Sequence, residues 1–109
     1  MMTEPNMTKD ATAVAIDRLH SAGWTDGALR GILMRSWELA QAVVMDTVII
    51  SVDATALAQR EDDDGRLLWT KSGPVGEVVE AALALPEPGQ PGAPAQPMAR
   101  SYHEQERDI

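Results

Sequence analysis

The sequence predicts a small, mainly α-helical domain with one β-hairpin, followed by a disordered Pro-rich C-terminal tail. Apolar residues recur every three or four positions in the first half of the chain. The pair Asp64-Gly65 separates two strand-like segments, and five of the seven prolines fall within residues 86–97. We therefore divide the 109 residues into a flexible leader (1–9), a helical domain with the hairpin (10–85) and a flexible tail (86–109).

Two helices are predicted before the hairpin. The first runs from an N-cap at Asp10 to about residue 22, where Gly23 ends it. The second begins at Thr25, a good cap, and keeps an apolar stripe at helical spacing through Trp37 to Val44. Because Trp37 continues this stripe, we expect its side chain in the main core, where replacement by Ala would be severe.

Residues 47–52 leave two alternatives open. Their β-branched side chains favour a strand, but the same segment continues the helical stripe without a Gly or Pro to break it. In the helical alternative, Asp53 caps a short helix over 54–60, or the whole stretch belongs to one long helix. Both alternatives lead to the acidic turn 62–65, which joins residues 57–61 to 66–71 as a hairpin.

A short closing helix and the tail follow the hairpin. Pro74 suits a first helical turn, apolar residues continue to Leu83, and Pro86 stops the helix. Residues 86–97 then resist both helix and sheet and act as a semi-stiff spacer to a candidate docking peptide at 98–109. We expect few contacts between this tail and the domain, so that removing 86–109 leaves the thermal midpoint nearly unchanged.

Composition and charge exclude several classes of function. The chain has no cysteine, which removes disulfides, thiolate metal sites and cysteine nucleophiles. A net charge of -8 disfavours binding to nucleic acid. The most apolar window, 39–52, is interrupted by Gln41 and Asp46 and is too short to span a bilayer. The N-terminus lacks a secretory pattern, so we expect a cytoplasmic protein without membrane contact.

Residue patterns for catalysis or cofactors are also missing. The acidic run 61–64 could suit a cation, but the calcium-loop pattern would place Arg60 and Lys71 where carboxylates are required. His20 lies three residues after Asp17, and the only other histidine is His103 in the tail. No nucleophile, base and orienting group can be assembled from these residues. We expect no metal, no cofactor and no enzymatic activity.

Residues 59–70 carry one family resemblance. Their sequence, QREDDDGRLLWT, resembles the wing of bacterial winged-helix regulators. The resemblance implies a degenerate winged-helix arrangement as one version of the fold, with Arg60 and Arg66 touching the DNA backbone from the wing. In that family the helix before the wing reads the major groove with basic and polar side chains, and residues 43–52 offer none for this role.

We therefore expect a non-catalytic acidic protein-binding factor, such as a regulator, adaptor, inhibitor or phage-type accessory protein, which acts by occupying a partner protein. The alternatives are a winged-helix-like DNA-binding transcription regulator and a small structural subunit of a larger assembly. A homo-oligomer is also open. The candidate partner-binding residues are aromatic or lie in the predicted docking peptide: Trp24, Trp69, Tyr102, His103 and Arg107.

Overall fold

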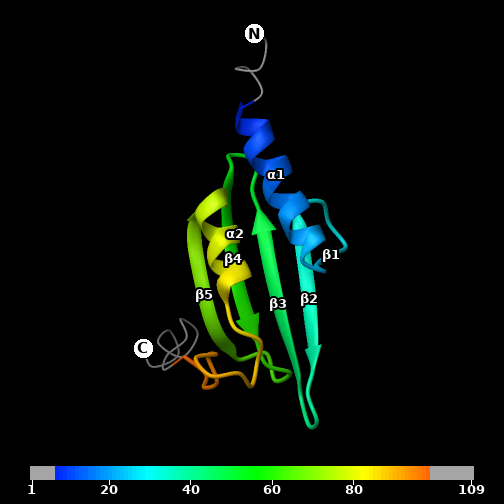
Figure 1. The fold of residues 1–109 in the computed structure, drawn as a ribbon, viewed down its shortest axis with the longest axis vertical. Coiled ribbons are helices and arrows are strands. Elements are labelled where there is room, and N and C mark those ends of the chain that lie inside the picture. The colour runs from blue at the N-terminus through cyan, green and yellow to red at the C-terminus, as the bar shows by residue number, and fades with distance from the viewer. Residues whose placement is uncertain (1–6, 99–109) are drawn as a thin grey trace, which may run out of the picture.

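The computed structural model describes residues 7–98, and these residues form one antiparallel sheet with two helices packed on the same face (Figure 1). The elements in chain order are α1 (Met7–Ser21), β1 (Thr25–Asp26), β2 (Ile32–Glu38), β3 (Val43–Ile50), β4 (Thr55–Glu61), β5 (Leu67–Pro74) and α2 (Val75–Ala84). The five strands lie side by side in sequence order. The prediction of a mainly helical fold is therefore wrong, and so is its winged-helix version.

The predicted second helix is the largest error. Its residues form β1, β2 and the start of β3, which are joined by the turn 39–42. Leu33 and Trp37 fit a helical stripe because they are four residues apart. The same spacing is twice the strand period of two, and Leu33, Arg35 and Trp37 share one face of the sheet. The turn contains neither Gly nor Pro, and the amide of Leu39 donates to the carbonyl of Ala42 at 2.8 Å.

The open question at 47–52 is settled in favour of a strand, because β3 extends to Ile50. Asp53 does not cap a helix. Its carboxylate accepts hydrogen bonds from the amide and the hydroxyl of Thr55, at 3.2 and 2.7 Å, in the tight turn between β3 and β4. Ala54 in this turn has a φ of 67°, a conformation that a non-glycine residue rarely adopts. The side-chain oxygen that suggested a helix cap thus stabilises a β-turn.

Three predicted elements are confirmed. The first helix is present as α1, although it begins at Met7, inside the predicted leader. The hairpin is present as β4 and β5, with Gly65 at a φ of 80° in the connecting turn. The closing helix is α2, which follows Pro74 directly. Each of these elements has a boundary marked by Gly or Pro, whereas the predicted caps at Asp10 and Thr25 do not begin helices.

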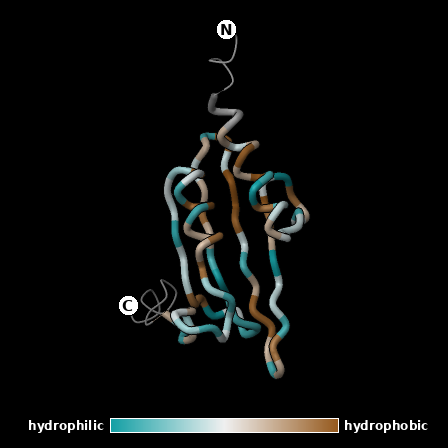
Figure 2. The backbone as a smooth tube through the Cα atoms, viewed as in Figure 1, coloured by the Kyte–Doolittle hydropathy of each residue, from teal (hydrophilic) through white to brown (hydrophobic). Residues whose placement is uncertain are grey.

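The core lies between the sheet and the two helices. In Figure 2 the hydrophobic colouring runs along the upper part of β3. One face of this strand is turned toward the helices. The buried apolar residues come from α1, the segment after it, the central strands and α2: Ala15, Leu19, Trp24, Leu33, Val48, Ala56, Ala58, Val75, Val78, Val79 and Ala82. Many are small, so the helices approach the sheet closely.

Residues 86–98 contain no helix or strand, but they are joined to the sheet. The carbonyl of Pro86 accepts a hydrogen bond from Arg60 in β4 at 2.8 Å, and the amide of Met98 donates to the carbonyl of Leu67 in β5 at 2.8 Å. This part of the predicted tail is therefore anchored at both ends and does not trail free of the domain. The predicted docking peptide lies outside the described residues, except for Met98.

Candidate functional site: the open face of the sheet

The face of the sheet that the helices cover carries a buried ion pair. Asp46 in β3 and Arg60 in β4 are register partners, and they are 2% and 0% exposed. Nε and Nη2 of Arg60 donate to the two carboxylate oxygens of Asp46 at 2.6 and 2.9 Å. Nε1 of Trp37 donates to Asp46 at 2.8 Å, and Nη1 of Arg60 reaches the Pro86 carbonyl. The two charges are thus well satisfied by each other and by neutral groups.

A third charge on the same face is packed between two indole rings. The guanidinium carbon of Arg35 lies 5.0 Å from the ring centroid of Trp24 and 4.4 Å from that of Trp37. Its Nη1 donates to the carbonyl of Ala22 at 3.2 Å. Burial lowers the pKa of Arg35, and the nearby Asp46 carboxylate opposes this effect. Arg35 therefore helps to hold the segment after α1 against β2.

The residues predicted to bind DNA serve the fold. Arg60 is fully buried, so its side chain is inaccessible to a DNA backbone. Arg66 is exposed, but its guanidinium contacts Asp62 at 2.9 Å and Asp64 at 3.3 Å. The motif that resembles a wing is thus a β-hairpin whose two arginines are engaged by carboxylates of the same chain.

Two of the predicted partner-binding residues lie in the described part of the chain, and both pack in or against the core. Trp24 is 3% exposed and belongs to the core, and Trp69 is partly buried against that core. Tyr102, His103 and Arg107 lie outside the described residues. His20, which the spacing pairs with Asp17, instead contacts Asp26 in β1, with 2.9 Å between its Nε2 and the carboxylate oxygen.

The acidic turn brings three carboxylates together. Oxygens of Asp62, Asp63 and Asp64 lie within 4.8 Å of one another. Asp62 accepts hydrogen bonds from the amides of Asp64 and Arg66 and from Nε of Arg66, at 3.0, 2.8 and 2.9 Å. The backbone hydrogen bond from Arg66 is the main cause that lowers the pKa of Asp62 below its ordinary value of 3.8. These bonds account for the cluster as a stabilised turn.

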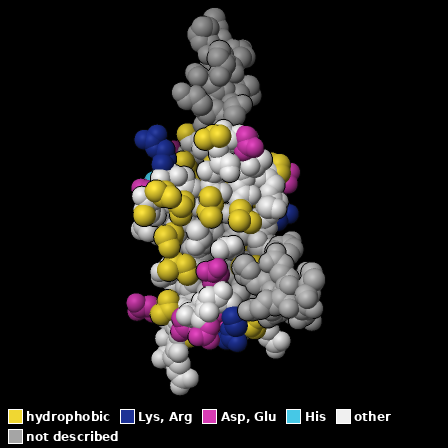
Figure 3. Space-filling model, turned by 180° about the vertical axis from the view of Figure 1, so that it is seen from behind, with side chains coloured by type: hydrophobic (Ala, Val, Ile, Leu, Met, Phe, Trp, Pro, Cys, Tyr) yellow, Lys and Arg dark blue, Asp and Glu magenta, His cyan; other side chains and the backbone are white. Residues whose placement is uncertain are grey.

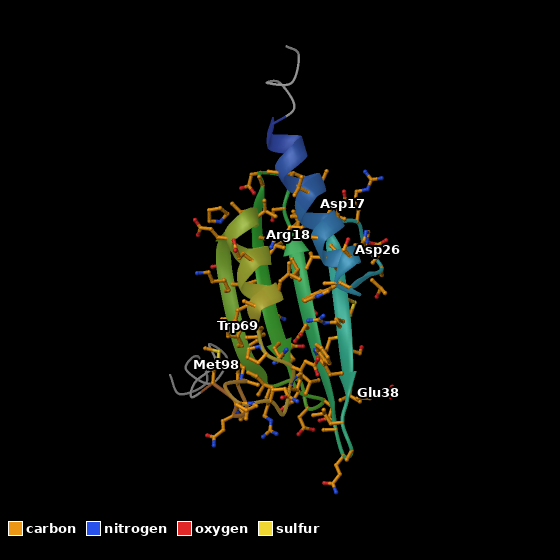
Figure 4. The ribbon with its side chains drawn as sticks, in the orientation of Figure 1. Asp17, Arg18, Asp26, Glu38, Trp69 and Met98 are labelled. Carbon is orange, nitrogen blue, oxygen red and sulfur yellow. The ribbon has the colours of Figure 1, made fainter. Side chains whose placement is uncertain are left out.

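A shallow groove separates the two helices on the covered side. It encloses about 420 Å³ and is lined by Val14, Asp17, Arg18, Ser21, Ala22 and Leu83. Figure 4 places Asp17 and Arg18 on α1 above the sheet. The groove is open to solvent, and its lining is mostly apolar, with charged side chains of both signs on its wall.

The opposite face of the sheet is not covered by any helix or strand among residues 7–98 (Figures 1 and 3). We call it the open face. Its side chains form three cross-strand rows: Ile32, Ile49, Leu57 and Ser72 in the first, Met34, Thr47, Gln59 and Thr70 in the second, and Ser36, Met45, Glu61 and Leu67 in the third. Ile49 and Leu57 remain 36% and 37% exposed.

The open face is nearly free of charge. The first and second rows contain no charged residue, and the third contains only Glu61. Glu38 lies at the far end of β2, opposite Val43, which is 40% exposed. In Figure 3 the hydrophobic side chains gather over the upper and middle parts of this face, and the acidic side chains gather mostly toward its lower end. The apolar side chains are therefore concentrated in the first row, and the second row is uncharged but mostly polar.

This face was not predicted from the sequence, because β2 and the start of β3 were interpreted as helical and residues 47–52 were left open between strand and helix. The available signal was the apolar character of both alternating sets of residues in β3, with Val44 and Val48 on one face and Met45 and Ile49 on the other. A strand that is apolar on both faces is typical of a sheet covered on both sides. Here the described residues cover only one.

This arrangement is a five-stranded antiparallel meander with α1 and α2 on one face and the open face on the other. Comparison of the chain with protein-family models, curated proteins and solved structures found no match. Separately, none of the helices within residues 7–98 is long and apolar enough to cross a membrane.

Proposed function

We propose that this chain is a non-catalytic protein-binding factor that docks a partner protein on the open face of its sheet. The observation that carries the proposal is the pair of uncharged rows on that face, with Ile32, Ile49 and Leu57 side by side in the first, which the described residues leave uncovered. In a chain with a net charge of -8, a surface without charge is a place where another apolar protein surface can approach without desolvating ions.

The size of the face suits a docking site. Strands β2 to β5 are seven or eight residues long. At a spacing of about 4.8 Å between strands and about 3.3 Å per residue, they cover a flat area of about 450 Å². The largest apolar patch on a typical monomer is about 300 to 600 Å² and is often functional, so a face of this size, with apolar and uncharged polar side chains, is compatible with docking.

The ionisable groups that already have partners within the chain support a binding role rather than catalysis. Asp46 and Arg60 are buried against each other, and Asp62 is saturated by the turn that it stabilises. His20 sits at the surface against Asp26 and does not line the groove between α1 and α2. Each of these groups has a structural partner, which leaves the open face as the surface without an intramolecular role among the described residues.

Affinity capture tests the proposal. The tagged full chain serves as bait in an extract of its source cells, and the retained proteins are identified by mass spectrometry. Replacing Thr47, at the centre of the second row, by Arg places a charge on the open face without removing apolar surface. We expect the protein retained by the unaltered chain to be lost with Thr47→Arg. Val14→Asp, on the covered side, is the matched control and should retain it.

Retention of the same protein by Thr47→Arg would contradict the proposal, provided that circular dichroism shows the variant to be folded. Thr47 is half-buried and pairs with Met34 and Gln59, so its replacement leaves the core residues in place. Loss of capture by Val14→Asp alone would move the binding site to the groove between α1 and α2.

A further inference from the structure

We infer that the outer edge of β2, at Ser36 and Glu38, binds a basic, extended segment of another protein, which adds a strand to the sheet. The groups that bind it are backbone N–H and C=O groups, which recognise another extended backbone. This inference goes beyond the proposed function and does not depend on it, because it uses the edge of the sheet and not the open face.

The backbone groups of β2 point alternately toward β3 and away from it. The amide of Ile50 donates to the carbonyl of Gly31, and the amide of Leu39 donates to the carbonyl of Ala42, both at 2.8 Å. With the register of the two strands, these bonds identify the odd-numbered residues of β2 as those that bond β3. The even-numbered residues therefore direct their N–H and C=O groups to the outer side.

The short strand β1 fills only one half of this outer edge. It pairs with Leu33 and Met34, and the chain before it belongs to α1 and the turn after that helix. Within residues 7–98 no strand pairs with the outer side of Ser36 and Glu38, and both residues are exposed (Figure 1). Their N–H and C=O groups are thus positioned for a strand that continues the line of β1.

The opposite edge of the sheet, β5, has features that hinder the addition of a strand. Its ladder with β4 has a register shift between Arg60 and Glu61, and Pro74 at its end has no N–H to donate. The carbonyl of Leu67 already accepts a hydrogen bond from the amide of Met98. The free half of β2 has no proline and a regular register with β3, so it is the more accessible edge.

The side chains beside the free edge restrict the chemistry of the added strand. Figure 4 shows Glu38 near the end of β2, on the side away from β3. A basic residue opposite Glu38 forms a favourable cross-strand pair, whereas an acidic residue is repelled. The net charge of -8 also attracts a basic segment. Opposite the partly buried ring of Trp37, a β-branched residue forms a favourable pair.

Titration of the isotope-labelled full chain with a synthetic peptide, followed through the NMR signals of its backbone amides, tests the inference. The probe is acetyl-Lys-Val-Lys-Val-Thr-Val-amide, whose antiparallel register places lysine opposite Glu38, valine opposite Trp37 and threonine opposite Ser36. We expect the amide signals of Ser36 and Glu38 to shift until the chain is saturated. N-methylation of the peptide's threonine removes the N–H that donates to the Ser36 carbonyl and should raise the dissociation constant at least about tenfold.

Variants of the chain supply matched controls. Ser36→Pro removes the outward N–H, and the β2–β3 ladder tolerates it because this N–H does not bond β3. It should abolish the shift of the Glu38 amide, whereas Ser36→Ala, which changes the side chain alone, should keep it. Glu38→Lys should weaken binding severalfold, and replacing the peptide's lysines by glutamates should restore binding to this variant. Thr47→Arg, on the open face, should bind the peptide unchanged.

Absence of shifts at Ser36 and Glu38 would overturn the inference, and so would equal binding of the peptide to Ser36→Pro and Ser36→Ala. If circular dichroism shows that Ser36→Pro is unfolded, the N-methylated peptide decides the question on the unaltered chain, and equal affinity for the two peptides contradicts the inference. Loss of peptide binding by folded Thr47→Arg would place the peptide on the open face instead. None of these outcomes affects the capture experiment, so the two proposals fail separately.

Discussion

The two faces of the sheet are built from the same strands and differ in how their side chains are covered. The covered face buries two charges, Asp46 and Arg60, among small residues such as Ala58, while the open face exposes Ile49 and Leu57. In most one-sided antiparallel sheets the apolar side chains face the core and the charges face water. Here apolar side chains lie on both faces, and the difference teaches that those of the open face are not required by the domain's own core. Substitutions on the two faces should therefore have very different effects.

The largest effect is expected at Arg60. Replacing Arg60 by Ala leaves Asp46 buried without its counter-charge, which typically costs about 3 to 5 kcal/mol, a large part of the stability of a small domain. Urea denaturation followed by circular dichroism measures the loss. The double variant Asp46→Leu with Arg60→Met removes both charges and should be more stable than Arg60→Ala. If Arg60→Ala were as stable as the unaltered chain, Asp46 would have to be solvated.

A smaller loss is expected when the chain is cut after Leu85. This truncation removes the Pro86 carbonyl, which accepts a hydrogen bond from the buried guanidinium of Arg60. Hydrogen bonds to charged groups contribute about 1.5 to 3 kcal/mol, so the thermal midpoint should fall, contrary to what the composition of the tail suggests. A chain cut after Met98 keeps this bond and is the control. Equal midpoints for the two truncated chains would contradict the anchoring of residues 86–98.

Trp37→Phe should cost less again, about 1 to 2 kcal/mol. The replacement keeps an aromatic ring over Arg35 and removes the indole N–H that donates to Asp46 at 2.8 Å. Urea denaturation gives the change in free energy of unfolding. Trp37→Ala removes both interactions and should be the more damaging of the two. If the two variants were equally stable, the ring would make no contribution through Arg35.

The smallest effect on stability is expected on the open face. Leu57→Thr introduces a β-branched residue, which strands favour, at a partly exposed position of β4 and should change the free energy of unfolding by less than about 0.5 kcal/mol, while it removes apolar surface from the open face. Ala58→Leu, one residue along the same strand, points into the closely packed core and should cost about 1 to 3 kcal/mol. Similar costs at both positions would mean that the open face is covered in the folded chain.

The parts of the fold that were predictable from the sequence carry local signals. Asp64-Gly65 marks the turn between β4 and β5 because glycine adopts positive φ there, and Pro74 marks the start of α2. The end of α1 is marked by Gly23, whose φ is 98°. In each case one residue type restricts the backbone enough to set a boundary.

The remaining features depend on partners that are distant in sequence. The turn 39–42 has no residue that demands a turn, so the sequence could be interpreted as a continuous helix. In the sequence, Arg60 resembles an exposed residue of a wing. Its burial can be inferred only when the pairing of β3 with β4 is known, because its partner Asp46 lies 14 residues earlier in the chain. The open face, in turn, requires the register of four strands to be known.

The order of the strands has a consequence for folding kinetics. Each strand pairs with its immediate predecessor, so the sheet can form by successive closure of short loops, whereas the contact between α1 and α2 joins the two ends of the domain. We expect the hairpins to form before the rate-limiting barrier and α1 to dock after it. Leu19→Ala, in α1, should then accelerate unfolding while leaving the refolding rate almost unchanged in a denaturant chevron.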